Sequence, residues 1–101
     1  MIIVHDTFVC KPGQASKLVK LFKEWADLEN KRMPFLDMTI MTDMTGQWHR
    51  VICVSHHKSL AEYEKNVSSM GDTPEHKKLM EKFKDMNEMY VSGNREIYKV
   101  W

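Results

Sequence analysis

The sequence predicts an α+β domain of the ferredoxin-like type, a β-α-β-β-α-β sandwich whose four-stranded antiparallel sheet carries both helices on one face. Three observations lead to this prediction. Apolar stretches of strand length and amphipathic stretches of helix length follow one another in that order. Residues 47–70 change from an apolar, β-branched run directly into a helical pattern. The length of 101 residues suits one domain, 1–101, with a thin core and no third layer.

The first half of the chain predicts a strand, a helix and a second strand. Residues 2–10 are rich in apolar side chains, and this strand ends near Pro12, because proline cannot donate to a sheet ladder. Residues 14–31 repeat apolar side chains at helical spacing on one face. Residues 35–44 alternate imperfectly between apolar and polar side chains, as in a strand with one buried face.

A short hairpin turn at 45–47 leads into a third predicted strand over 48–56. Ser59 and Glu62 then fit the S-x-x-E capping box that begins a helix. In such a box the serine oxygen accepts a hydrogen bond from a backbone N–H of the first turn. The second helix is therefore expected to begin directly after the third strand.

The second helical region is predicted to break at Gly71 and to restart with Thr73 as its N-cap and Pro74 in its first turn. Residues 95–101 form the last predicted strand. The central strands carry apolar side chains on both of their faces. The sheet face opposite the helices is therefore apolar and needs to be covered. We expect that cover to be a second copy of the chain, which makes a homodimer through the open sheet face.

Composition and charge argue against several classes of protein. Lys and Arg number 15 and Asp and Glu number 14, which gives a formal net charge of +1, whereas a nucleic-acid platform carries a clear basic excess. No apolar run approaches the roughly 20 residues that span a bilayer, and the N-terminus lacks the pattern of a secretory signal. Cys10 and Cys53 are expected to be reduced thiols. We therefore expect a cytoplasmic protein that binds neither nucleic acid nor membranes.

Four stretches resemble the dimeric α+β barrel superfamily. They are the strand-Lys-Pro-Gly-helix unit at 2–31, the Gly-x-Trp hairpin at 46–48, HHKSLAEYEK at 56–65 and GNREIYKVW at 93–101. The pattern is most similar to the NIPSNAP-like members, and it also resembles the antibiotic-biosynthesis-monooxygenase-like and haem-degrading members. The resemblance implies the ferredoxin-like fold and a homodimer. It implies no particular reaction, because the superfamily carries many activities.

The haem-degrading members form their pocket with an Asn on the first strand, an aromatic residue on the second helix and a His after the break in that helix. The matching positions here are Asp6, Tyr63 and His76. Asp6 lacks the amide donor of Asn, Tyr63 replaces a bulkier Trp, and His76 alone is kept. These departures from the haem-degrading pattern argue against haem chemistry, and we expect no cofactor.

Polar residues within apolar stretches are the candidate catalytic residues. Asp6 interrupts the first strand, and a buried carboxylate needs a donor, for which Arg50 and Tyr63 are the candidates. His76 lies at the start of a helix, where an imidazole could serve as a base. In a catalytic set, Asp6 and His76 would transfer protons and Arg50 would stabilise an oxyanion. The alternative is a structural Asp–Arg pair and a partly buried helix histidine.

Large side chains at helical spacing are the candidate substrate-binding residues. Trp25, Tyr63 and Phe83, with several methionines, could shape a pocket for a small apolar ligand between the sheet and the helices. The same residues could equally fill an ordinary core. The histidines lack the spacing of a metal site, and His56 and His57 are adjacent on a strand and point to opposite faces. We therefore expect no metal.

The sequence is compatible with two functions. The chain is either a small ligand-binding or cofactor-independent oxygenase- or isomerase-like protein, or a non-catalytic homodimeric binding or structural protein. The first requires a pocket between the sheet and the helices, and the second does not. The sequence does not decide whether the protein is an enzyme.

Overall fold

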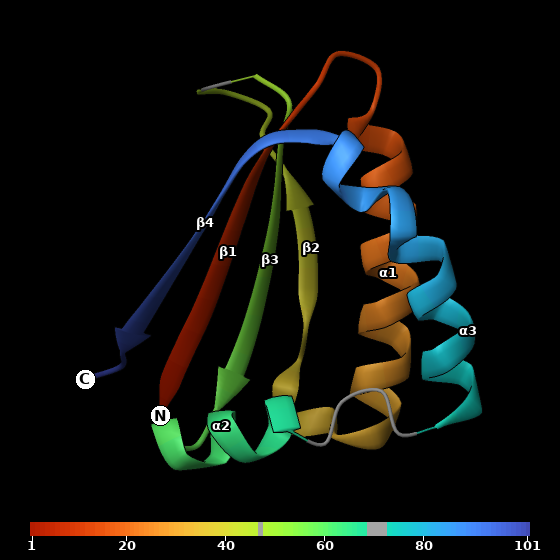
Figure 1. Cartoon of the computed structure of the whole chain (residues 1–101). Coiled ribbons are helices and arrows are strands. Elements are labelled where there is room, and N and C mark those ends of the chain that lie inside the picture. Colours follow the sequence, from red (N-terminus) through yellow and green to blue (C-terminus); the bar gives the residue numbers. More distant parts are fainter. Residues whose placement is uncertain (47, 69–72) are drawn as a thin grey trace.

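A computed structural model describes residues 1–46, 48–68 and 73–101 of the chain (Figure 1). The predicted break at Gly71 lies outside the described residues, as does Gln47 in the hairpin turn. The elements are, in order, β1 (Ile2–Cys10), α1 (Ala15–Arg32), the 3-10 turn η1 (Pro34–Leu36), β2 (Thr39–Thr42), β3 (Arg50–His57), α2 (Leu60–Ser68), α3 (Pro74–Lys82), the 3-10 segment η2 (Phe83–Glu88) and β4 (Tyr90–Lys99).

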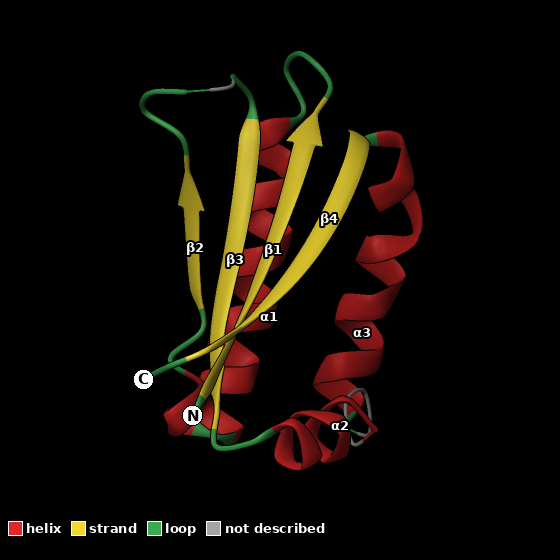
Figure 2. Ribbon diagram, turned by 90° about the vertical axis from the view of Figure 1, so that its left-hand side faces the viewer, coloured by secondary structure: helices red, strands yellow, loops and turns green. Residues whose placement is uncertain are grey.

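The strands form an antiparallel sheet in the order β2-β3-β1-β4. The helices gather on one side of this sheet, and in the described part of the chain no helix covers the other side (Figure 1). Figure 2 looks onto that open face, with α1 behind the strands. The predicted α+β, ferredoxin-like fold is confirmed.

The register of β1 decides which side chains meet on each face. Val4 lies opposite Ser55, and Asp6 lies opposite both Cys53 and Arg95. Because side chains alternate along a strand, these residues share the face that carries the helices. The odd-numbered residues of β1, with Ile52 and Val54 of β3, point to the open face.

The second strand is shorter than predicted. Pro34 begins a 3-10 turn, and the side chain of Asn30 holds both backbone groups of Met38: its Nδ2 donates to the Met38 carbonyl at 3.1 Å, and its Oδ1 accepts from the Met38 N–H at 2.8 Å. These bonds replace the ladder bonds that Met38 would make in a strand. The third strand begins at Arg50 because His49 adopts a left-handed conformation with φ 63°.

The last strand begins at Tyr90, five positions before the predicted start at Arg95. The stretch Ser92-Gly93-Asn94 is typical of a turn, which explains the error. The structure instead uses Gly93 for a close approach, since a Cβ at this position would lie 3.2 Å from the ring of Phe8. Pairing with β1 therefore overrides the local turn propensity.

The predicted caps of both later helices are confirmed. Ser59 Oγ accepts from the Glu62 N–H at 3.2 Å, and Thr73 Oγ1 accepts from the His76 N–H at 3.2 Å. Cys10 and Cys53 are free thiols, as expected. None of the helices in the described ranges is both long and apolar enough to cross a membrane.

Candidate functional site

A cavity of about 410 Å³ lies between the helix-bearing face of the sheet and the helices. Its apolar wall comes from β1, α1, α2, the segments around η1 and η2, and α3, through Val4, Phe8, Phe22, Trp25, Leu36, Met38, Val67, Met80, Phe83 and Met86. Its polar wall comes from β1, β3, α2, η2 and β4, through Asp6, Cys53, Ser55, His57, Tyr63, Asn66, Asn87 and Arg95. The volume lies within the range of small-molecule sites.

The polar wall contains an ion pair that links three elements. Arg95 on β4 donates from Nε to Asp6 Oδ1 at 2.7 Å and from Nη2 to Asp6 Oδ2 at 3.0 Å. Its third nitrogen, Nη1, donates to the Tyr63 hydroxyl on α2 at 2.7 Å. The hydrogen bond to Asp6 raises the pKa of Arg95 above its already high value. Both carboxylate oxygens of Asp6 are thus bound to one guanidinium, which is the planar bidentate arrangement.

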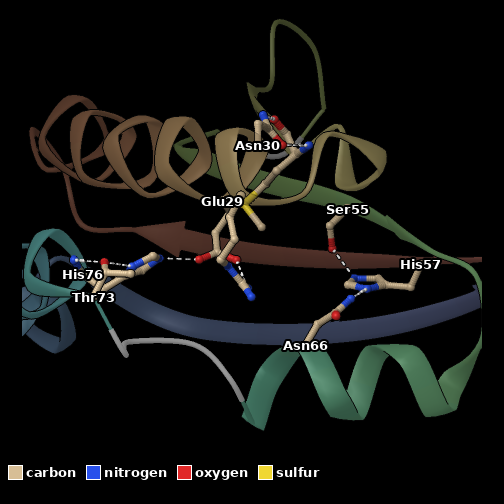
Figure 3. A network of polar contacts seen from close by, with 9 residues as sticks. Glu29, Asn30, Ser55, His57, Asn66, Thr73 and His76 are labelled. Atoms are coloured by element: carbon tan, nitrogen blue, oxygen red, sulfur yellow. Dashed lines mark hydrogen bonds and ion pairs between the residues drawn. The ribbon is translucent and has the colours of Figure 1, made fainter.

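A second chain of polar contacts centres on His57, whose side chain is buried. Figure 3 shows Ser55 and Asn66 on either side of its ring. His57 Nε2 lies 3.0 Å from Ser55 Oγ, and Nδ1 lies 3.2 Å from Asn66 Nδ2. Burial, with a smaller effect of His56, lowers the pKa of His57 and so favours the neutral imidazole. The His57 ring also meets the Tyr63 ring edge-on at 5.0 Å between centroids.

Cys53 lies on the cavity wall beside Asp6, its partner across the β1–β3 ladder. Burial, together with the negative charge of Asp6, raises the pKa of the Cys53 thiol to about 12. Burial also raises the pKa of Cys10. Both thiols therefore stay protonated at neutral pH and are poor nucleophiles.

A third polar cluster lies outside the cavity, around Glu29 of α1. The Glu29 side chain is fully buried, and its carboxylate contacts His76 Nε2 at 2.5 Å and Arg32 Nη2 at 2.6 Å. The other ring nitrogen of His76 contacts Thr73 Oγ1 at 2.5 Å (Figure 3). The cluster thus joins the start of α3 to α1.

Comparison with known proteins identifies solved structures that share the fold of this chain. No family model matches the sequence, and no curated protein matches it. Among solved structures, a NIPSNAP domain protein from Burkholderia xenovorans superposes with a TM-score of 0.75 at 9% identity, over 100% of this chain and 95% of that one. A NIPSNAP family protein from Agrobacterium tumefaciens gives 0.76 at 14% identity, over 99% and 87%.

The chain shares its fold with these NIPSNAP domain proteins. A proposed antibiotic biosynthesis monooxygenase from Deinococcus radiodurans shares it, with a TM-score of 0.71 at 17% identity over 100% of this chain and 93% of that one. The predicted resemblance to NIPSNAP-like and antibiotic-biosynthesis-monooxygenase-like proteins is therefore confirmed for the architecture. At these identities the likeness concerns the fold alone.

This fold brings four of the six predicted site residues to the cavity. Asp6, Trp25, Tyr63 and Phe83 all lie on its wall. His76 lies behind that wall, where it meets the Trp25 ring edge-on at 5.3 Å and binds Glu29. Its contacts are those of a buried structural histidine.

The predicted pairing of Asp6 with Arg50 is wrong. Arg50 of β3 lies opposite Val9 of β1. Val9 and Asp6 are three positions apart on β1, so the strand directs Arg50 and Asp6 to opposite faces of the sheet. The Arg50 side chain instead contacts Asp43, with Nε 3.4 Å from Oδ2, and lines a separate hollow of about 680 Å³ between the start of α1 and the β2–β3 connection. Arg50 is therefore not the partner of Asp6.

Sequence reasoning missed Arg95, Ser55, His57 and Asn66. The sequence predicts Arg95 in the last strand but does not indicate that it pairs with Asp6, because pairing of the first and last strands is a property of the fold. Ser55 and His57 are two positions apart at the end of the third strand, which the sequence predicts to end at His56 and which in fact includes His57, and this spacing could have indicated a shared face. In the described ranges, no group of three or more His, Cys, Asp or Glu side chains could hold a metal ion.

The Glu29 cluster predicts a large effect of His76→Ala on stability. Removing the imidazole leaves a fully buried carboxylate with one fewer donor, so we expect the free energy of unfolding to fall by about 2–4 kcal/mol. Urea denaturation measures this change, and the exposed neighbour Lys77→Ala serves as control. In a double-mutant cycle with Glu29→Ala the two losses should be far from additive; additive losses would contradict the coupling.

The lowered pKa of His57 predicts a pH dependence of stability. The unfolded chain protonates this imidazole near 6.5, whereas the folded protein does so at lower pH. The unfolded state thus binds more protons between the two pKa values, and the free energy of unfolding falls as the pH drops below about 6.5. Denaturation at several pH values should show a smaller fall in His57→Gln than in the wild type. Parallel curves for the two proteins would contradict the assignment.

Proposed function

We propose that this protein binds a small, largely apolar molecule in the cavity between its sheet and its helices. The observation that carries the proposal is the cavity itself, whose wall is apolar on most sides and polar where Asp6, Arg95 and Tyr63 meet. An apolar pocket with a few convergent polar groups is the usual form of a small-molecule site.

The composition of the apolar wall suits a flat ligand. Phe22, Trp25 and Phe83 offer aromatic faces and edges, and Trp25 and Phe83 meet edge-on at 5.8 Å between centroids. Met80 and Met86 add flexible thioethers that adapt to the shape of a ligand. Dispersion contacts with such a wall would supply affinity, and the polar end would supply orientation.

Turnover of the bound molecule, as in a cofactor-independent oxygenase or isomerase, is the second candidate. The shared fold with a proposed antibiotic biosynthesis monooxygenase favours it. In that case the Tyr63 hydroxyl, which Arg95 orients, would donate to negative charge that develops on a substrate oxygen, the role that the sequence suggested for Arg50. Asp6 would act as a positioning residue, because Arg95 binds both of its oxygens.

The binding proposal predicts one saturable site for a neutral naphthyl ketone, 2-acetylnaphthalene. Titration followed by ¹H–¹⁵N NMR should shift resonances around Trp25, Tyr63 and Phe83. Val67→Trp should weaken binding at least tenfold, because Val67 is partly exposed on α2 and a larger side chain there enters the cavity. Glu64→Trp, on the same helix but outside the cavity wall, should bind as the wild type does. Shifts spread over the surface without saturation would refute the site.

We also propose that two copies of the chain pack through their open sheet faces. Apolar side chains of all four strands share this face, namely Ile3, Val9, Met41, Ile52, Val54 and Tyr98. Met41 and Tyr98 are 41% and 48% exposed in one copy. Packing two such faces about a two-fold axis would remove this apolar surface from water, and the same patch serves both copies.

The homodimer proposal predicts that Val54→Lys yields a monomer. Val54 lies at the centre of β3 on the open face, opposite His5 and Thr39, and a buried ammonium without a partner is strongly unfavourable in the proposed interface. Sedimentation equilibrium should give twice the chain mass for the wild type and for Glu64→Lys on the helix side, and one chain mass for Val54→Lys. A wild type that stays monomeric at high concentration would exclude the dimer.

A further inference from the structure

We propose that the polar end of the cavity presents the hydroxyl protons of Tyr63 and Ser55 to the ligand, and thereby selects a neutral molecule with a carbonyl oxygen. The inference rests on the proposed binding function and narrows its ligand class. It follows from the direction of the hydrogen bonds that hold each hydroxyl.

The direction of the first hydrogen-bond chain is fixed by Arg95. A guanidinium has only donors, so the Tyr63 oxygen must accept from Arg95 Nη1, at 2.7 Å. The phenolic proton then points away from Arg95. Among the described residues, it has no acceptor of its own, and Tyr63 lies on the cavity wall. A ligand acceptor in the cavity would complete this bond.

The direction of the second chain is fixed by Asn66. The amide nitrogen of Asn66 can only donate, so His57 Nδ1 accepts, at 3.2 Å. A neutral imidazole then carries its proton on Nε2 and donates it to Ser55 Oγ, at 3.0 Å. The lowered pKa of His57 agrees with this neutral form. Ser55 thus also accepts within the protein and has its own proton left to donate into the cavity.

The charges at this end favour a neutral acceptor over a carboxylate. The guanidinium of Arg95 is bound in a bidentate pair by Asp6, so the pair carries no net charge. A ligand carboxylate would approach the Asp6 anion as well as the Arg95 cation. A neutral carbonyl oxygen, as in a ketone or quinone, can accept from these hydroxyls without that repulsion.

Both donors lie on the polar wall of the cavity, and His57 lies next to each of them. Tyr63 and His57 are in edge-on ring contact at 5.0 Å, and His57 holds Ser55 on the same strand. The apolar remainder of a ligand would extend toward Trp25 and Phe83. The ligand class is therefore a planar apolar molecule with a carbonyl group at one end.

The test compares three probes of matched shape: 2-acetylnaphthalene, 2-ethylnaphthalene and 2-naphthoate. NMR titration of the wild type should show the ketone binding about tenfold more tightly than the hydrocarbon, since each hydrogen bond contributes about 0.5–1.5 kcal/mol, and also more tightly than the carboxylate.

Tyr63→Phe and Ser55→Ala should each reduce the preference for the ketone severalfold and leave the affinity for the hydrocarbon unchanged. Tyr98→Phe and Ser92→Ala, which alter hydroxyls outside the cavity wall, should keep the full preference.

The outcomes separate this inference from the binding proposal. Equal affinity for ketone and hydrocarbon would overturn the inference and leave the binding function in place. Tighter binding of the carboxylate would also overturn it, because Arg95 would then be available to anions. Failure of all three probes to bind would refute the binding function itself.

A second measurement is independent of any ligand. The ¹⁵N chemical shifts of the His57 ring at pH 7 should show the tautomer with its proton on Nε2. A proton on Nδ1 would overturn the inference, because Ser55 would then donate to His57 instead of to a ligand.

Discussion

The alternation of side chains along β1 decides what each face of this sheet can do. β1 is central and pairs with both β3 and β4, so its register brings Asp6 opposite Cys53 and Arg95 in a single row. A slip of one residue would turn Asp6 to the open face and bring Thr7 toward the helices. The polar wall of the cavity and the apolar open face are therefore two results of one register.

The ion pair between Asp6 and Arg95 is the main polar link in that row. The Asp6 side chain is 16% exposed and that of Arg95 is 56% exposed, so solvent screens the pair and its net contribution to stability is modest. The geometry of this ion pair is more important for the cavity than its contribution to stability. With two nitrogens on Asp6, the third nitrogen of Arg95 points at Tyr63 and binds α2 to the sheet. A similar link runs from Asn66 of α2 to His57 of β3.

The sequence predicts the fold well because the patterns that indicate helices and their caps depend on residues that are close together in the chain. The capping Ser59, the N-cap Thr73 and the helical stripe of 14–31 each depend on a few neighbouring residues, and the structure confirms all three. It predicted the partner of Asp6 poorly because strand pairing is not local. Arg50 and Arg95 are both arginines near apolar strand residues, and only the register shows that Arg95 faces Asp6. Likewise, the buried Glu29 that binds His76 lies 47 positions away in the chain, and no spacing rule links them.

The placement of the hydroxyl donors connects the binding proposal to the attachment of α2. Tyr63 lies on α2 and Ser55 on β3, so a ligand that accepts from both would bridge the helix and the sheet. The bonds that orient these donors, from Arg95 to Tyr63 and from Asn66 to His57, also hold α2 against the strands. Ligand binding and the docking of α2 should therefore stabilise each other, because a ligand that binds only the docked helix shifts the equilibrium toward it. Loss of Arg95 would weaken both at once, whereas loss of the Ser55 hydroxyl would weaken ligand binding and leave the link between Asn66 and His57 in place.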